Sequence, residues 1–323
     1  MSSRATEPSA RGARLTYAIA PPNQATPRER RRAIAAMQAA RISALPIDAL
    51  LVYDVQDESA RVGAPRPFSF HPKVDPLSYA FDELRLGALP RVVYRAVAQP
   101  EGEASLGPWL ARLQARGGEA VLVGAPSRST RAALTLTQAY ALCRRRHPSL
   151  SFGGVVIPER HEASGAEDAR VWAKVQQGCR FFVSQTVWSV AATKRLLRDV
   201  RRRAEQEGAE APPILLTLSP CGSEQTLRFL KWLGVGLPAY VEQELLSARD
   251  MLARSVELAA ETFDCLRAFA LEQGLHVGAN VESVSARAEE IDASLELLAR
   301  VDRLTSPRAN ARGGAPRFID AST

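Results

Sequence analysis

The sequence has few of the residues that build metal centres or disulfide frameworks. Its 323 residues include four cysteines and four histidines, and no two cysteines form a Cys-x-x-Cys pair. Structural zinc sites take their ligands from closely spaced pairs, so we expect no metal ion. The cysteines are expected to be reduced and mostly buried thiols: Cys143, Cys179, Cys221 and Cys265.

Long apolar runs are also missing. No stretch of about 18 uninterrupted apolar residues occurs, which excludes an ordinary membrane-spanning helix. The first residues, Met1 to Arg14, contain no apolar segment of the kind found in a secretory signal. Hydrophobic residues make up 46% of the chain and charged residues 24%, which is ordinary for a folded domain. We therefore expect a soluble, cytoplasmic protein without a membrane partner.

The net charge is +7, and much of the excess lies in three arginine clusters, at residues 28 and 30–32, 144–146, and 201–203. A nucleic-acid interface would gather such clusters on one surface and place aromatic residues between them. Here they are dispersed along predicted helices, so we interpret them as solvated helix faces and expect no nucleic-acid partner. The positive potential also suits anionic small molecules.

Short apolar runs alternate with helical patterns along the chain. This alternation is typical of parallel βα units, and continuously apolar strands are typical of a sheet covered on both sides. The eight strand candidates are 15–20, 50–55, 91–97, 120–124, 152–157, 181–187, 214–218 and 275–279. Eight such units predict an α/β fold of the (β/α)8, or TIM barrel, class. A doubly wound open sheet is the structural alternative.

Helix signals fill the intervals between the strands. Thr26-Pro27-Arg28-Glu29 is a capping-box arrangement, Ser129 is expected to open a helix to about Arg146, and Ser189 one to about Glu207. Between the seventh and eighth strands we expect one helix at 223–233 and a segment, 238–272, long enough for two more, ended by Gly274.

The chain ends differ in composition from the region between them. Residues 1–13 and 304–323 are rich in Ser, Arg, Gly, Pro and Ala and are expected to be disordered tails. Residues 14–303 are expected to form the barrel. The segment 61–76, with four prolines, is predicted to be a long loop after the second strand. It would lie at the carboxyl-terminal mouth, where barrel enzymes keep their chemistry.

Isolated polar residues follow several predicted strands. Gln185 leaves a very apolar strand, and its amide could bind a heterocycle or could equally be satisfied by nearby backbone. His161 follows the fifth strand and Lys174 lies one helix later. Each could serve a ligand or simply be a surface residue. An acid could come from the loop after strand two, at Asp54, Asp57 and Glu58, although such carboxylates are usually solvated.

Three blocks, in order, resemble the signature of the methylenetetrahydrofolate reductase family, in which strands end in Y-P-E-x-H and I-T-Q and a helix ends in K-x-x-x-G. They are Gly154-Val155-Val156-Ile157-Pro158-Glu159-Arg160-His161, Lys174-Val175-Gln176-Gln177-Gly178 and Phe182-Val183-Ser184-Gln185. Further segments fall in the family's order: Pro21-Pro22-Asn23, Leu216-Thr217-Leu218-Ser219-Pro220, Gly234-Val235-Gly236-Leu237-Pro238 and 275–280. The resemblance covers about residues 14–302.

The resemblance implies a (β/α)8 oxidoreductase of one-carbon metabolism and methionine biosynthesis. It would reduce 5,10-methylenetetrahydrofolate to 5-methyltetrahydrofolate with NAD(P)H, and in the family the hydride passes through FAD. By motif position, Gln185 would hold the pterin, and Asn280 is the second residue expected at the folate. His161 and Lys174 would face the cofactor, as would Gly124 in the turn after strand four.

The chain departs from the family at several positions. The family's first-strand glutamate, its general acid, is Ala18, and the L-R-G-D turn reads Leu122-Val123-Gly124-Ala125. The tyrosine of Y-P-E-x-H is Ile157. The chain is more similar to a divergent branch of the family that works without flavin, so we expect the protein to bind no stoichiometric FAD.

If catalysis survives these changes, a replacement acid is needed. The candidates are Asp54, Asp57 and Glu58 after strand two and Glu282 after strand eight. Two other functions stay open. One is a catalytically inactive folate-binding or regulatory barrel, and the other is a different barrel oxidoreductase or folate-linked one-carbon enzyme. The sequence also leaves open a homo-oligomer.

Overall fold

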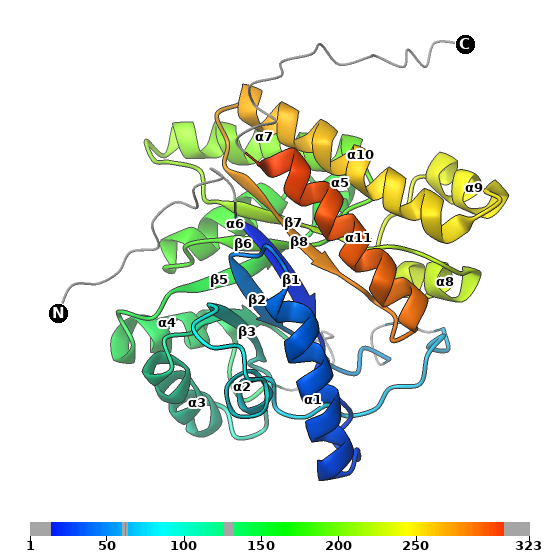
Figure 1. The fold of residues 1–323 in the computed structure, drawn as a ribbon. Coiled ribbons are helices and arrows are strands. Elements are labelled where there is room, and N and C mark those ends of the chain that lie inside the picture. The colour runs from blue at the N-terminus through cyan, green and yellow to red at the C-terminus, as the bar shows by residue number, and fades with distance from the viewer. Residues whose placement is uncertain (1–13, 60–61, 63, 126–131, 307–323) are drawn as a thin grey trace.

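Eight parallel strands close into a barrel in sequence order, β1-β2-β3-β4-β5-β6-β7-β8 (Figure 1). The computed structural model describes residues 14–59, 62, 64–125 and 132–306. The strands are β1 Leu15–Ile19, β2 Ala49–Val52, β3 Arg91–Ala96, β4 Glu119–Val123, β5 Phe152–Val156, β6 Phe182–Thr186, β7 Ile214–Leu218 and β8 Val277–Glu282. The predicted (β/α)8 class is confirmed, and the doubly wound alternative is wrong because β8 pairs with β1 and leaves no sheet edge.

Helices surround the barrel, and three of them lie between β7 and β8, as predicted. They form the layer around the strands in Figure 1. The helices are α1 Arg28–Ser43, α2 Pro76–Ser78, the π-helix η1 Tyr79–Glu83, α3 Glu103–Ala115, α4 Leu136–Arg146, α5 Pro158–Ser164, α6 Glu167–Gln176, α7 Val190–Gln206, α8 Glu224–Trp232, α9 Ala239–Ser247, α10 Met251–Glu272 and α11 Ala288–Thr305.

Alternation along each strand divides the core into two parts. One set of side chains packs inside the barrel, and it includes Leu51, Val92, Val121 and Leu215. Their strand neighbours pack outward against the helices in the larger cluster. Because a parallel strand in a barrel is covered on both faces, nearly every strand residue is apolar, and this explains why the sequence revealed the strands so clearly.

Two helix starts differ from the predicted ones. Residues 126–131, including Ser129, lie outside the described residues, and α4 begins only after Thr135. The Thr135 side chain accepts a hydrogen bond from the Gln138 N–H, and Gln138 completes a capping box. The expected capping box at Thr26 is wrong, because Pro27 is the N-cap of α1 and no side chain caps that end. By contrast, Ser189 and Ser223 cap α7 and α8 as predicted.

The last strand begins and ends later than predicted. The expected strand covered 275–279, whereas β8 runs from Val277 to Glu282. Its pairing with β1 continues to the Ala18–Glu282 register pair, because backbone hydrogen bonding tolerates the polar Asn280 and Glu282 inside the barrel. Both residues therefore belong to the strand rather than to the loop after it.

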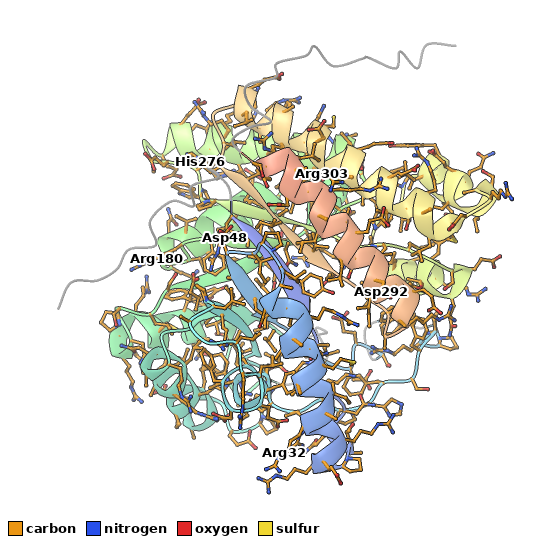
Figure 2. The ribbon with its side chains drawn as sticks, viewed as in Figure 1. Arg32, Asp48, Arg180, His276, Asp292 and Arg303 are labelled. Atoms are coloured by element: carbon orange, nitrogen blue, oxygen red, sulfur yellow. The ribbon has the colours of Figure 1, made fainter. Side chains whose placement is uncertain are left out.

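The two ends of the barrel are easy to locate in Figure 2. Asp48, Arg180 and His276 precede β2, β6 and β8 and lie on one side, at the amino-terminal end. Arg32, near the start of α1, lies toward the opposite side, the carboxyl-terminal mouth. The predicted tails lie outside the described residues except for 304–306, where α11 ends at Thr305.

Other features of the described chain bear on the sequence expectations. The four cysteines are free thiols, and all but Cys265 are buried. The three arginine clusters lie on different helices, α1, α4 and α7. None of the described helices combines the length and apolar character needed to span a bilayer.

Candidate functional site

Polar side chains gather at the carboxyl-terminal mouth of the barrel, on β6, β7, β8 and the neighbouring strands. Glu282 on β8 is the register partner of Ala18 on β1. On the other side of β8, Leu218 pairs with Val281, so Ser219 and Glu282 leave the sheet as neighbours. The mouth thus places a carboxylate beside the alanine at the first-strand position.

Glu282 is half-buried and receives two hydrogen bonds. The Thr186 hydroxyl donates to its Oε1 at 3.0 Å, and the Tyr53 hydroxyl donates to the same carboxylate. Burial raises the pKa of the Glu282 carboxyl above its usual range, and these two hydrogen bonds lower it by less. A carboxyl group of raised pKa keeps its proton to a higher pH than an ordinary glutamate, which suits it to act as a general acid.

Tyr53 is positioned by two further contacts. It accepts a hydrogen bond of 2.9 Å from the Asn280 Nδ2. Its ring meets the Tyr94 ring edge to face, with centroids 4.7 Å apart. The Tyr53 hydroxyl thus accepts from Asn280 and donates to Glu282, and the Tyr94 ring packs against the Tyr53 ring.

Asn280 is fully buried below Glu282 and is saturated with hydrogen bonds. It accepts one from the Thr16 hydroxyl at 3.0 Å and donates to Tyr53 and to the Thr217 Oγ1. An amide with both N–H groups occupied has little left to offer a ligand. The contacts make Asn280 a support for Tyr53, and its direct role at a folate stays a prediction.

Gln185 lies in an irregular part of β6. The pairing of β6 with β7 shifts register between Val183 and Thr186, and this bulge makes Thr186 the residue that reaches Glu282. The Gln185 Nε2 donates to the Leu233 carbonyl at 3.0 Å, in the turn after α8. The Gln185 N–H group is thus satisfied by backbone, which was one of the two interpretations of this residue. The side chain is half-buried.

Glu159 was not among the candidates, yet it lies beside this turn. It is the second residue of α5, directly after β5, and both of its carboxylate oxygens are buried without a hydrogen-bond partner in the described structure. Burial raises the pKa of the Glu159 carboxyl to about 7, and the charge of Glu162 adds to this. A Cβ at Gly236 would come within 2.5 Å of the Glu159 Cγ, so the turn packs directly on this side chain.

The three acidic candidates after β2 do not join the mouth carboxylate. Asp54 accepts a hydrogen bond of 2.8 Å from the Ala96 N–H, and it therefore fixes the end of β3. Asp57 is exposed, and hydrogen bonds from the Ser59 side chain and N–H lower its pKa. Glu58 is half-buried in the same loop, where its charge acts on Arg66. Burial raises the pKa of Asp54 as well as that of Glu282. The two differ in their partners, because Asp54 accepts from a backbone N–H whereas Glu282 accepts from the Thr186 hydroxyl inside the mouth.

His161 is buried between helices. Its Nε2 lies 2.9 Å from the Asp199 Oδ2 on α7, and its Nδ1 lies 3.7 Å from the Asp168 Oδ1 on α6. Arg203 binds the other oxygen of Asp168. These contacts tie α5 to α6 and α7, and they do not support the expected contact of His161 with a cofactor.

Lys174 and Gly124, the other expected cofactor residues, differ in their surroundings. The Lys174 Nζ donates to the Val155 carbonyl at 2.6 Å and lies over the Phe182 ring, and burial lowers the pKa of Lys174. Its ammonium group therefore binds β5. A Cβ at Gly124 would meet nothing within 4 Å, so this end of β4 is open.

The long loop after β2 is held against α8. The Arg66 guanidinium lies over the Phe70, Phe229 and Trp232 rings, 5.1 to 5.2 Å from their centroids. The Trp232 Nε1 donates to the Ala64 carbonyl and the Gln225 Nε2 to the Pro67 carbonyl. Figure 1 shows this segment in cyan on the side to which the β1 and β8 arrows point. The extra helix α8 thus supports one wall of the mouth.

Among the residues that the structure describes, no three His, Cys, Asp or Glu side chains come together to hold a metal ion. The residues that sequence reasoning missed are Tyr53, Thr186 and Glu159. Glu159 carried a signal, since a glutamate directly after an apolar strand is placed at the mouth by the fold itself. Nothing in the sequence shows that Tyr53 and Thr186 meet at Glu282, because that depends on the β6 bulge and on barrel closure.

Comparison with solved structures gives a strong match over nearly the whole chain. An uncharacterised protein from Clostridium thermocellum, solved with two copies of 5-methyl-5,6,7,8-tetrahydrofolic acid bound, is 34% identical to this chain. The alignment covers 90% of this chain and 96% of that one, with a TM-score of 0.77. Neither a protein-family model nor a curated protein matches the sequence.

Two other solved structures align far more loosely. A dihydropteroate synthase from Xanthomonas albilineans, in complex with indole-2-carboxylic acid and 6-chloroguanine, is 14% identical over 94% of each chain, with a TM-score of 0.45. An EDTA monooxygenase from Chelativorans sp. BNC1 is 13% identical over 92% of this chain and 98% of that one, with a TM-score of 0.46. These two alignments are too loose to bear on the site.

Proposed function

Since the chain belongs to the same protein family as the folate-binding Clostridium thermocellum protein, we propose that it binds a reduced folate at the carboxyl-terminal mouth of its barrel. We propose further that it reduces 5,10-methylenetetrahydrofolate to 5-methyltetrahydrofolate with NAD(P)H. The observation that carries the reductase proposal is Glu282. It stands in register with Ala18, bears two hydrogen bonds and has a raised pKa.

The reaction needs one proton and one hydride. The bond between N10 and the bridging carbon breaks as N10 takes a proton from Glu282, and an iminium forms between N5 and that carbon. Hydride from the nicotinamide C4 then adds to the carbon and makes the methyl group. The nicotinamide is oxidised, the folate is reduced, and solvent returns the proton to Glu282. General acids of this kind contribute about a hundred- to ten-thousand-fold in rate.

The neighbours of Glu282 fix the orientation of its carboxyl group. Tyr53 and Thr186 hold the carboxyl in one orientation, and Asn280 holds Tyr53. The aromatic pair Tyr53 and Tyr94 limits water on one side of the group, which keeps the proton on the carboxyl until a base such as N10 approaches. Tyr53 and Thr186 contact the acid through their side chains, and Asn280 acts through Tyr53.

The proposed reaction uses no flavin. The residues aligned with the family's FAD contacts do not fit that group, because Val123, Ala125 and Ile157 stand at those positions and lack the expected polar groups. His161 and Lys174 bind Asp199 and the Val155 carbonyl instead. Because these side chains are engaged within the protein, we propose that the hydride passes directly from the nicotinamide to the folate.

A folate-binding barrel without catalysis is the second candidate. The alanines Ala18 and Ala125 favour it, because neither side chain can take part in proton transfer or hydrogen bonding. Both candidates predict that 5-methyltetrahydrofolate binds the purified protein in calorimetry. Oxidation of NAD(P)H that depends on 5,10-methylenetetrahydrofolate, in flavin-free protein, supports the reductase. Binding without that oxidation supports the second candidate, and absence of binding overturns both.

A further inference from the structure

Glu159 is a buried carboxyl group that no part of the proposed reaction uses. Both of its oxygens lack a hydrogen-bond partner in the described structure. Burying a carboxyl group without partners is costly, and a folded protein normally satisfies such a group with its own polar atoms or with a ligand. The side chain therefore has unused capacity to accept two hydrogen bonds.

The position of Glu159 connects it to the mouth. In the β5–β6 pairing Val156 is the partner of Ser184, so Ile157 and Gln185 leave the sheet side by side, and Glu159 follows two residues later. The turn after α8 contacts both groups. Gln185 donates to the Leu233 carbonyl, and Glu159 packs on Gly236. An amide and an orphan carboxylate thus lie on adjacent strand ends under one turn.

Gly236 makes this arrangement possible. Any side chain at that position would place its Cβ within 2.5 Å of the Glu159 Cγ. The turn from Gly234 to Gly236 carries no titratable group, and Gln185 on β6 is neutral. The charge that acts on Glu159 comes from Glu162 on its own helix, which is exposed and bonded to Arg195. No cation among these neighbours competes for the carboxylate.

We propose that Glu159 recognises the amino-pyrimidine edge of the folate's pterin. That edge presents two parallel donors, the 2-amino group and the N3–H, which match the two oxygens of one carboxylate in the manner of a bidentate Arg–carboxylate pair. Gln185 beside it can meet the neighbouring polar atoms of the ring. This proposal rests on the proposed folate site and adds to it the residue that selects a 2-amino heterocycle.

The test uses the full chain, the variant Glu159→Gln and two ligands. The ligands are 5-methyltetrahydrofolate and its analogue lacking the 2-amino group, and affinities are measured by calorimetry. Glu162→Gln is the matched control, since it changes an exposed carboxylate one helical turn away. Circular dichroism and thermal melting show that each variant is folded.

We expect wild-type protein and Glu162→Gln to prefer 5-methyltetrahydrofolate over the analogue by about 10- to 150-fold, the worth of hydrogen bonds to a charged group. Glu159→Gln should bind 5-methyltetrahydrofolate more weakly by a similar factor and lose most of the preference. Wild-type affinity should also rise as pH increases through about 7, because the charged carboxylate accepts both N–H groups. Any effect of ligand protonation on affinity is the same for both proteins. It therefore cancels when the affinities of wild-type protein and Glu159→Gln are compared at each pH.

Each outcome has a distinct meaning. If wild-type protein binds 5-methyltetrahydrofolate and folded Glu159→Gln binds it equally well with the same preference, the role of Glu159 is disproved while the folate site stands. If wild-type protein binds neither ligand, the role of Glu159 and the proposed function fail together.

Discussion

At the scale of single residues, the chemistry of the mouth depends on where one carboxyl group is fixed. Glu282 shares a register position with Ala18 across the β8–β1 pair, so an acid absent from one strand is present on the next. Thr186 and Tyr53 orient it from two other strands. The barrel can therefore supply a proton at nearly the same place from a different strand.

Replacing Glu282 with Gln should remove the proton donor and keep the shape. We expect the reductase rate to fall by about a hundred- to ten-thousand-fold while folate affinity changes little. Because the acid form is the active one, the wild-type rate should fall as pH rises through the raised pKa of Glu282. Steady-state kinetics between pH 5 and 9 check both points. A Glu282→Gln protein with the wild-type rate would exclude Glu282 as the acid.

Gln185 tests the folate site itself. Gln185→Ala removes the hydrogen bond to the Leu233 carbonyl as well as the ligand contact. We expect a five- to 150-fold loss of folate affinity and a loss of about 1 kcal/mol in the free energy of unfolding. Melting and calorimetry on the same sample separate the two effects. Lower stability with unchanged folate affinity would show that Gln185 serves the fold alone.

Glu159 should also affect how stability depends on pH. Its pKa in the folded protein is about 7, above the ordinary value of 4.5, so the fold favours the protonated carboxyl. The stability that this contributes is present at acid pH and is lost as pH rises through about 7, by at most about 3 kcal/mol. Denaturant titrations at pH 5 and pH 8 should show a smaller loss for Glu159→Gln than for wild-type protein. Equal losses would contradict the burial of this carboxyl.

The choice among the four acidic candidates could not be made from sequence. All four are expected in loops after strands, and a loop carboxylate looks the same in sequence whether it caps a backbone N–H, as Asp54 does, or faces solvent, as Asp57 does. Glu282 in fact lies in β8 itself. The deciding facts are the barrel register and the β6 bulge, which are set by contacts between residues far apart in the chain.

At the scale of elements, local signals explain most of the fold and also the errors. Apolar strands were recognisable because barrel strands are covered on both faces. The end of β8 was missed because Asn280 and Glu282 are polar residues inside the barrel, held by Thr16, Thr186 and Tyr53. The start of α4 differs from the prediction because the helix begins at the Thr135–Gln138 capping box, a local signal that lies after Ser129 in the chain.

The loop after β2 offers a test at this scale. Arg66 lies among three aromatic rings and is 13% exposed, and cation–π contacts of this kind contribute about 0.5–2 kcal/mol. Arg66→Leu should release the loop from α8, so amide hydrogen exchange at residues 64–70 should become faster. Arg228→Leu, an exposed position on α8, is the control. An unchanged exchange rate in Arg66→Leu would mean that the loop is held without Arg66. The hydrogen bonds from the Gln225 and Trp232 side chains to loop carbonyls would then be sufficient.

At the scale of the whole molecule, the barrel brings the mouth residues together from strands far apart in the chain, and α8, between β7 and β8, supports one wall of the mouth. The prediction at this scale concerns flavin. We expect the purified protein to show no flavin absorption, because the side chains at the family's flavin positions are apolar or bound elsewhere. A yellow protein that keeps a full equivalent of flavin through dialysis would contradict this.

The most direct test of the account follows the hydride. NADH or NADPH carrying deuterium at the transferred C4 position is incubated with flavin-free protein and 5,10-methylenetetrahydrofolate, and the product is analysed by mass spectrometry. Direct transfer predicts 5-methyltetrahydrofolate with one deuterium in its methyl group and no loss of label to water. A flavin carrier would instead exchange the label with solvent, and a methyl group without deuterium, or no methylated product at all, would contradict the proposed reaction.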